Sequence, residues 1–286
     1  SDVYKRQEYQ TRIGNKVGLR LFGNLTYSKN KIVFRDEPAM QYAYQKSEGT
    51  RYGEFYGYIA EGYFQSEEEI KKSPRQMREL APGDIKYKDL NDDGVIDAND
   101  QCYLGKSWFP SWSYGMGFNI NYHNFDLALF FQGVSDVSIM ANGGSIDTGN
   151  GDWGASGVGI VPFTGMGLNP SNVITKALDR WTADNPRADA WYPRMTANAT
   201  TNDNNYVNST HWLKDGSYLR LKQASLGYTL ENKKLMDKGI EYLYFYLSGQ
   251  NLLTFSKFKL WDPELGSNGA KYPLSRMVTL GMRVSF

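Results

Sequence analysis

Apolar and polar residues alternate along several stretches of the chain, with the period of two that is typical of a β-strand whose two faces differ in environment. In residues 112–122 every second side chain from Trp112 to Tyr122 is apolar, and Ser, Gly or Asn lies between them. Residues 125–133 alternate in the same way and follow after only two residues. A two-residue turn places Tyr122 opposite Phe125, so the apolar faces coincide and the pair predicts a β-hairpin.

The same alternation predicts four further strands. In one of them the apolar parity changes after Leu221, which predicts a β-bulge near Gln223. Another is apolar on both faces at its start, so its parity stays open. One short helix is expected around residues 66–77. The four strands are expected over residues 17–27, 217–230, 242–255 and 276–286.

Short connections alternate with long non-periodic ones, which is the pattern of an outer-membrane β-barrel with strands of about ten residues. A soluble β-sandwich explains the periodicity equally well. However, connections beyond about fifteen residues are uncommon in soluble domains, and this chain ends on a strand that finishes with Phe286. We therefore expect an all-β fold: a partial antiparallel transmembrane β-barrel with extracellular loops at residues 30–110, 134–212 and 256–275.

Composition narrows the function classes. The net charge is +1 and basic runs are absent, so the chain has no electrostatic preference for nucleic acid. It has one cysteine, Cys102, and two distant histidines, which argues against a Cys-based zinc site or a histidine-dependent triad. The opening residues 1–7 (SDVYKRQ) resemble translated adapter sequence, and we expect them to be a non-native leader.

The stretch DLNDDGVIDAND (89–100) contains five aspartates and fits the calcium-loop template D-x-[DN]-x-[DN]-G, with Asp in place of the terminal Glu. Gly94 allows the sharp turn that lets alternate oxygens converge on one ion, and an all-oxygen set suits Ca²⁺. The residues before it read as a strand, which argues against a true EF-hand. The alternative is a solvated loop of Asx-turns without an ion. The expected ligands are Asp89, Asn91, Asp93, Val95 through its carbonyl, Asp97 through water, and Asp100.

Five stretches occur in an order that resembles the C-terminal region of SusC/RagA-family TonB-dependent transporters, over roughly residues 16–286. The resemblance implies a barrel of about 22 strands that imports oligosaccharides or peptides across the outer membrane. It also implies outer-membrane lipid around the barrel, a SusD-like surface lipoprotein as a lid, and the TonB complex as energy source. The five stretches are GDIKYKDLNDDGVIDANDQ, SYGMGFNINYHNFDLALFFQG, DGSYLRLKQASLGYTL, SGQNLLTFSKFKLWDPE and YPLSRMVTLGMRVSF.

About six strands cannot close so wide a barrel, and an open sheet edge is not tolerated in lipid. Neither a plug nor a TonB box is found in the sequence. We therefore expect the chain to be the last part, the C-terminal piece, of a longer TonB-dependent receptor barrel, with gating residues elsewhere.

Two other functions stay open: a secreted calcium-stabilised β-sandwich that binds carbohydrate and, more remotely, a fragment of a glycoside hydrolase. The carboxylate pairs Glu67–Glu69 and Asp262–Glu264 fit an acid and a base, although surface charge explains them as well. We expect no catalytic activity. The loop tryptophans either stack on sugars or pack the loops together; they are Trp153, Trp181, Trp191, Trp212 and Trp261.

Overall fold

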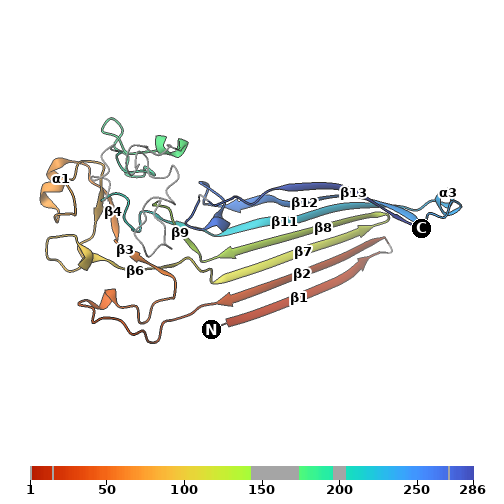
Figure 1. The fold of residues 1–286 in the computed structure, drawn as a ribbon, viewed down its shortest axis with the longest axis horizontal. Coiled ribbons are helices and arrows are strands. Elements are labelled where there is room, and N and C mark those ends of the chain that lie inside the picture. Colours follow the sequence, from red (N-terminus) through yellow and green to blue (C-terminus); the bar gives the residue numbers. More distant parts are fainter. Residues whose placement is uncertain (1, 15, 143–173, 196–203, 270) are drawn as a thin grey trace.

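The computed structural model describes residues 2–14, 16–142, 174–195, 204–269 and 271–286. Its largest element is a seven-stranded antiparallel sheet in which strands that follow one another in the sheet also follow one another in the chain (Figure 1). Strands are present at all six predicted positions. The seven are β1 (Asp2–Ile13), β2 (Val17–Ser28), β7 (Trp112–Tyr122), β8 (Phe125–Ser135), β11 (Tyr218–Leu230), β12 (Tyr242–Ser256) and β13 (Met277–Ser285).

Strand β1 was not predicted. It pairs with β2 along its whole length, and residues 2–7, which the sequence analysis set aside as a leader, form its first half. Lys5 and Gln7 share a face with Tyr9, so polar residues interrupt the apolar side of this strand and the alternation is weak. On β2 this face is paired with Leu25, Gly23 and Leu21.

The predicted hairpin and the predicted bulge are both present. Tyr122 pairs with Phe125 as expected, and His123 in the turn adopts a positive φ of 53°. The register of β11 shifts between Leu221 and Gln223, which confirms the bulge and returns the apolar residues to one face.

The sheet has one apolar face and one polar face. An unbroken row of apolar side chains crosses six strands, and three of its members are at least 48% exposed: Leu226, Leu247 and Leu280. A row that is polar except for one alanine crosses the same strands on the other face. The apolar row is Leu19, Ile120, Leu127, Leu226, Leu247 and Leu280, and the polar row is Arg20, Asn119, Ala128, Ser225, Ser248 and Thr279.

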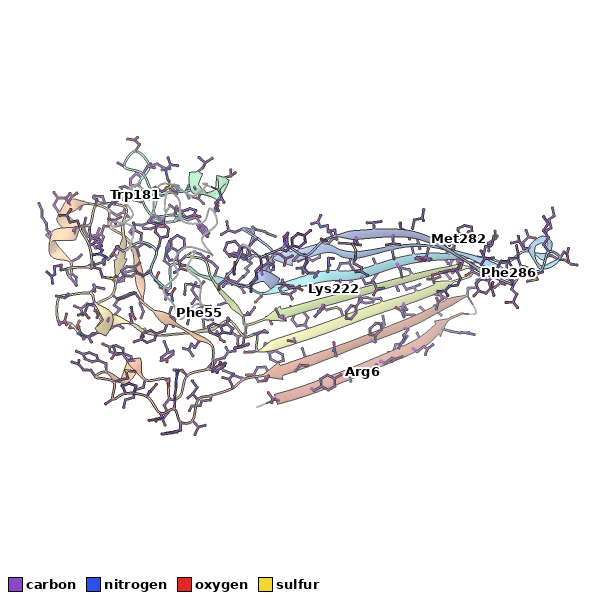
Figure 2. The ribbon with its side chains drawn as sticks, in the orientation of Figure 1. Arg6, Phe55, Trp181, Lys222, Met282 and Phe286 are labelled. Atoms are coloured by element: carbon purple, nitrogen blue, oxygen red, sulfur yellow. The ribbon has the colours of Figure 1, made fainter. Side chains whose placement is uncertain are left out.

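The long connections gather at one end of the sheet, and the short ones at the other end (Figure 1). We name them loop 1 (residues 29–111), loop 2 (residues 136–217) and loop 3 (residues 257–276), and together the loop assembly. Phe286 lies at the end away from Phe55 and Trp181 of the loop assembly (Figure 2).

The loop assembly contains short strands and single helical turns, and none of the described helices is long and apolar enough to cross a membrane. Helix α1 is shorter than the predicted 66–77, because Pro74 disfavours helical backbone at Ser73 before it. The short elements are β3 (Glu54–Gly57), β4 (Ala60–Tyr63), β5 (Ile85–Tyr87), β6 (Cys102–Ser107), β9 (Ser138–Met140), β10 (Leu213–Asp215), α1 (Glu67–Lys72), α3 (Lys233–Met236) between β11 and β12, and the 3₁₀ turns η1 (Ala43–Gln45), η2 (Ala98–Asp100), η3 (Thr175–Leu178) and η4 (Pro263–Leu265).

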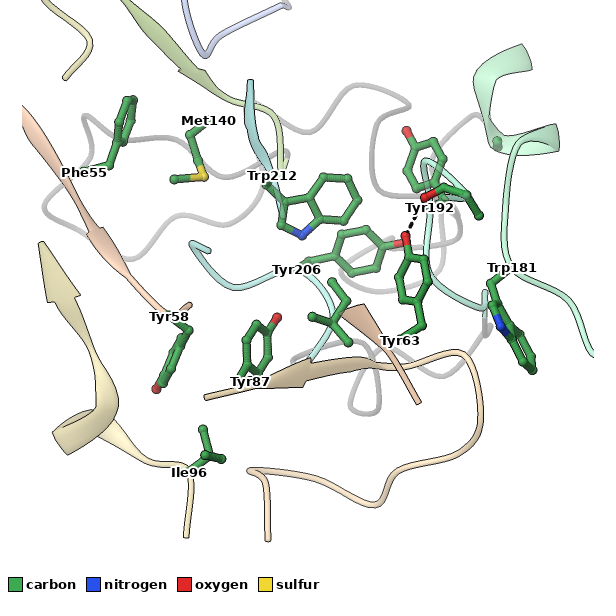
Figure 3. Packing of buried hydrophobic residues seen from close by; sticks show 13 residues of the cluster. Phe55, Tyr58, Tyr63, Tyr87, Ile96, Met140, Trp181, Tyr192, Tyr206 and Trp212 are labelled. Carbon is green, nitrogen blue, oxygen red and sulfur yellow. Dashed lines mark hydrogen bonds between the residues drawn. The ribbon is translucent and has the colours of Figure 1, made fainter. Parts of the chain in front are cut away.

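The hydrophobic core of the described residues lies in the loop assembly and not against the large sheet. Trp212 is fully buried at its centre, with Tyr206, Tyr192 and Tyr63 packed around it (Figure 3). No residue of either buried cluster belongs to the seven long strands. A sandwich would instead place its core on the apolar face of the sheet, so the arrangement favours a barrel wall that carries folded loops.

Candidate functional site

The acidic stretch forms a tight loop between β5 and η2. Asp89 opens it: its Oδ1 accepts a hydrogen bond from the N–H of Asp92 at 2.7 Å, and its Oδ2 accepts one from the N–H of Gly94 at 2.8 Å. Asp93 Oδ1 accepts from the N–H of Val95 at 2.8 Å. Gly94 has φ of +81°, so the sharp turn expected at this position is present.

The second half of the loop is capped by its own carboxylates. Asp97 Oδ1 accepts from the N–H of Asn99 at 2.7 Å, and Asp100 Oδ2 accepts from the N–H of Asp97 at 2.9 Å, which is a capping box on η2. Asp100 is fully buried, and its Oδ1 accepts from the N–H of Leu90 at 2.7 Å. The two ends of the loop are therefore held together by Asp100.

The loop is fixed to the rest of loop 1 by backbone pairing. The N–H of Arg75 donates to the carbonyl of Gly94 at 2.9 Å, and the N–H of Ile96 donates to the carbonyl of Arg75 at 2.8 Å. Ile96 is buried in the aromatic core. Strand β5 precedes the loop, so it is not an EF-hand. Within the described residues, no three acidic, histidine or cysteine side chains are grouped closely enough to hold a metal ion.

A buried polar network joins loop 1 to loop 2. It was not predicted from the sequence. Asp84 is fully buried; it accepts from Arg194 Nη2 at 2.9 Å and from Asn205 Nδ2 at 2.7 Å. Asn205 in turn accepts from the N–H of Ile85 at 2.9 Å and, through its carbonyl, from Trp212 Nε1 at 2.7 Å. No local pattern reveals such a network, because its partners lie about 110 to 120 residues apart.

His211 lies beside this core. Its ring packs edge-on against Trp212 and Tyr63, with centroids 4.7 and 5.4 Å apart. Its Nε2 lies 3.2 Å from the carbonyl of Trp191. Burial lowers the pKa of His211 to about 4, helped by the charge of nearby Lys214 and opposed by the Trp191 carbonyl. The imidazole is therefore neutral at pH 7.

Four of the five loop tryptophans considered for sugar stacking pack against other residues of the loop assembly. Trp212 and Trp181 are buried in the core, where they cannot stack on a ligand unless the loops unfold. Trp191 packs against Trp212 at 5.4 Å, and Trp261 packs against Phe258 at 4.7 Å. Trp153 lies outside the described residues.

The two carboxylate pairs considered for glycoside hydrolysis have other partners. Asp262 and Glu264 surround the buried Arg220, and Glu69 pairs with Lys86 at 3.3 Å. An acid and a base need a substrate between them, whereas Arg220 lies between Asp262 and Glu264.

Comparisons with known proteins identify relatives. No protein-family model matches the chain. TonB-dependent receptor P26 of Formosa agariphila is 30% identical over 241 residues, which are 79% of this chain and 22% of the relative. TonB-dependent receptor P3 of the same organism is 28% identical over 255 residues, 84% of this chain and 22% of the relative. The chain thus spans 22% of the length of either protein.

Solved structures support the fold. A structure of the RagAB peptide transporter matches with a TM-score of 0.69 and 19% identity over 100% of this chain and 29% of that chain. The RagAB peptide importer in its closed-closed state matches with a TM-score of 0.66 and 21% identity, over 98% of this chain and 29% of that chain.

An antiparallel sheet with an exposed apolar face, short turns at one end and folded loops at the other is part of an outer-membrane β-barrel. The chain belongs to the TonB-dependent receptors, which are proteins of the outer membrane. The matches confirm its resemblance to the SusC/RagA family of these receptors.

Proposed function

We propose that the chain forms part of the wall and outer loops of a nutrient importer that takes up peptides or oligosaccharides across the outer membrane. The observation that carries this proposal is the apolar row across six strands, none of whose members is buried, with a mostly polar row on the other face. Lipid is the solvent that makes such a face stable, and water or cargo suits the other face.

The partners follow from the same proposal. The loop assembly faces the outside of the cell, where a SusD-like lipoprotein covers the barrel mouth, and the TonB complex supplies energy through parts of the protein beyond this chain. A peptide cargo is favoured by the structural relatives, which are described as peptide transporters. No polar feature of the described residues distinguishes peptide from oligosaccharide.

The acidic loop adds a structural calcium ion to the proposal. Its support is the spacing of oxygen donors around a glycine turn that has formed as the template requires. The carboxylates already accept N–H groups of the loop, and each ionised carboxylate has about four acceptor sites, so these bonds leave room for an ion. Asp93 is exposed and Asp89 is partly exposed, and these two carboxylates flank the glycine turn at which the ion would bind.

Two experiments test the importer. The full-length protein is expected to sediment with outer membranes and to need detergent for release; release into plain buffer would contradict a barrel. A deletion strain and its complemented partner are then grown with a protein hydrolysate or single polysaccharides as sole carbon source. Slow growth on one class alone identifies the cargo, whereas equal growth on all of them contradicts nutrient import.

A further inference from the structure

Loop 3 turns back over the polar face of the sheet. The register places Arg220 of β11 opposite Gln132 of β8 and Thr254 of β12, with side chains on the polar face. Arg220 is only 2% exposed, and Tyr218, on the same face two residues earlier, is also buried. The residues that cover it come from η4, in the middle of loop 3.

The contact is a cluster of charges around one arginine. Arg220 Nη2 lies 2.5 Å from Asp262 Oδ1, and Arg220 Nε lies 3.5 Å from Glu264 Oε1. The hydroxyl of Tyr218 donates to Glu264 Oε1 at 2.8 Å, and Lys222 Nζ lies 3.9 Å from the same oxygen. The guanidinium also stacks 5.6 Å from the centre of the Tyr218 ring. We call these five side chains the clasp.

Loop 3 presents its two carboxylates rigidly. Asp262 Oδ1 also accepts from the N–H of Glu264 at 3.0 Å, and so caps η4. Trp261 Nε1 donates to the carbonyl of Gly266 at 2.8 Å, which closes the loop behind η4. Because the turn is braced internally, the carboxylates and the loop move together.

The far side of loop 3 is attached to loop 2. Ser267 Oγ accepts from the N–H of Met140 at 3.0 Å, and Phe258 packs into a small buried cluster with Ile139 and Ala141. Loop 3 therefore bridges the inner surface of the barrel wall, through the clasp, and the base of loop 2, through β9.

A partly separated clasp, in which the buried arginine has lost its carboxylates but is not yet in water, is unfavourable. Removing either side leaves unpaired charge in a poorly hydrated place, which costs far more than the loss of an exposed pair. Partial opening of the clasp is therefore disfavoured, and a clasped and a released loop 3 are the two discrete states that a gate would use.

We propose that residues 257–269 of loop 3 form a strap that the clasp holds against the polar face of the wall, that this strap shields the wall around Thr254 from outside, and that opening the clasp uncovers this part of the wall. The direction of access rests on the proposed importer. The strap itself rests only on the contacts of Arg220.

The test measures how fast a cysteine under the strap reacts. Thr254→Cys is introduced into the full-length protein with Cys102→Ser, and a membrane-impermeant maleimide is applied to intact cells and to isolated outer membranes. The labelling rate of the same protein without Thr254→Cys is measured as background and subtracted. We expect Arg220→Met to speed labelling several-fold in both preparations.

A matched control comes from the same loop. Lys257 is 88% exposed and lies 4.0 Å from Asp215, so Lys257→Met removes an exposed ion pair and is expected to leave the labelling rate unchanged. A triple variant, R220M with D262N and E264Q, removes the clasp without leaving unpaired charge. It separates loss of the strap from a general folding defect, and we expect it to label as fast as R220M.

Equal labelling of the wild-type clasp, R220M and the triple variant would overturn the strap. Faster labelling in isolated membranes but not in intact cells would keep the strap and refute the outward orientation on which the importer depends. Because labelling needs no transport, a failure to import any nutrient would leave the result on the strap intact.

Discussion

At the scale of single residues, His211 makes the loop assembly sensitive to acid. Burial holds its pKa at about 4, below the ordinary value of 6.5. Between about pH 6.5 and pH 4, His211 is therefore protonated in the unfolded state but neutral in the folded state. The stabilisation is fully present above about pH 6.5 and falls as the pH drops toward 4. The difference between the folded and unfolded pKa of His211 corresponds to at most about 3 kcal/mol of unfolding free energy.

This predicts that the melting temperature of the loop assembly, followed by near-ultraviolet circular dichroism of its tryptophans in the detergent-solubilised full-length protein, falls between pH 7 and pH 4.5. His211→Phe keeps a ring beside Trp212 and is expected to flatten that dependence. An equally steep dependence in the variant would assign it to the carboxylates instead.

Gly57 of loop 1 lies directly against the backbone of Asn208 in loop 2. A Cβ on Gly57 would lie 2.2 Å from the carbonyl oxygen of Asn208. That backbone is held in place, since the same carbonyl accepts from the N–H of Tyr58 at 2.9 Å and Thr210 donates its N–H to the Tyr58 carbonyl at 3.0 Å.

Gly57→Ala is therefore expected to destabilise the loop assembly by about 1–3 kcal/mol through overpacking. The control is Gly18→Ala in β2, where the new Cβ would meet nothing closer than 3.6 Å. Protease resistance of the loops in purified protein measures both. Equal resistance of the two variants would contradict the prediction and show that the backbone at Asn208 shifts to accommodate the added Cβ.

At the scale of elements, the acidic loop is the proposed calcium site. Asp89→Ala with Asp93→Ala removes the two carboxylates that accept the N–H groups of Gly94 and Val95. We expect the double variant to lose calcium-dependent protection from proteolysis within residues 50–110, while the sheet is unaffected.

The reference for this prediction is the wild-type protein with calcium, magnesium or a chelator. Magnesium should protect poorly, since it demands a tighter octahedral shell than this loop offers. If wild type resists protease equally in calcium and chelator, the stretch is a solvated Asx-turn loop, as the alternative reading of the sequence holds.

At the scale of the whole molecule, the sheet and the loop assembly are stabilised by different means. The long strands are held by ladder hydrogen bonds and lipid, whereas the loop assembly depends on a core of buried aromatic residues and on the network around Asp84. Two separate thermal transitions are therefore expected for the full-length protein in detergent.

Trp212→Ala should lower only the first transition, because the indole is fully buried in the loop core and its loss leaves a cavity worth about 3–5 kcal/mol. Near-ultraviolet circular dichroism reports the loops, and heat-dependent gel mobility reports the barrel. A single shared transition, shifted as a whole by the variant, would contradict this division.

The sequence alone determined the parts that depend on local pattern. Strand positions, the hairpin at Tyr122 and Phe125, and the bulge beside Gln223 followed from alternation, because a two-residue period assigns each side chain to one face. The turn at Gly94 followed likewise from a template in which each residue has a fixed backbone role. Residues 2–13 escaped this reasoning, because Lys5 and Gln7 interrupt the alternation of β1.

The tertiary structure decided everything that depends on distant partners. Sequence could not reveal that Trp212 would be a core residue and not a sugar platform. It also could not reveal that Asp84 meets Arg194, or that Asp262 and Glu264 enclose Arg220. Irregular loops have no period that assigns a face to a side chain, so burial and pairing are set only when segments 40 to 120 residues apart pack together.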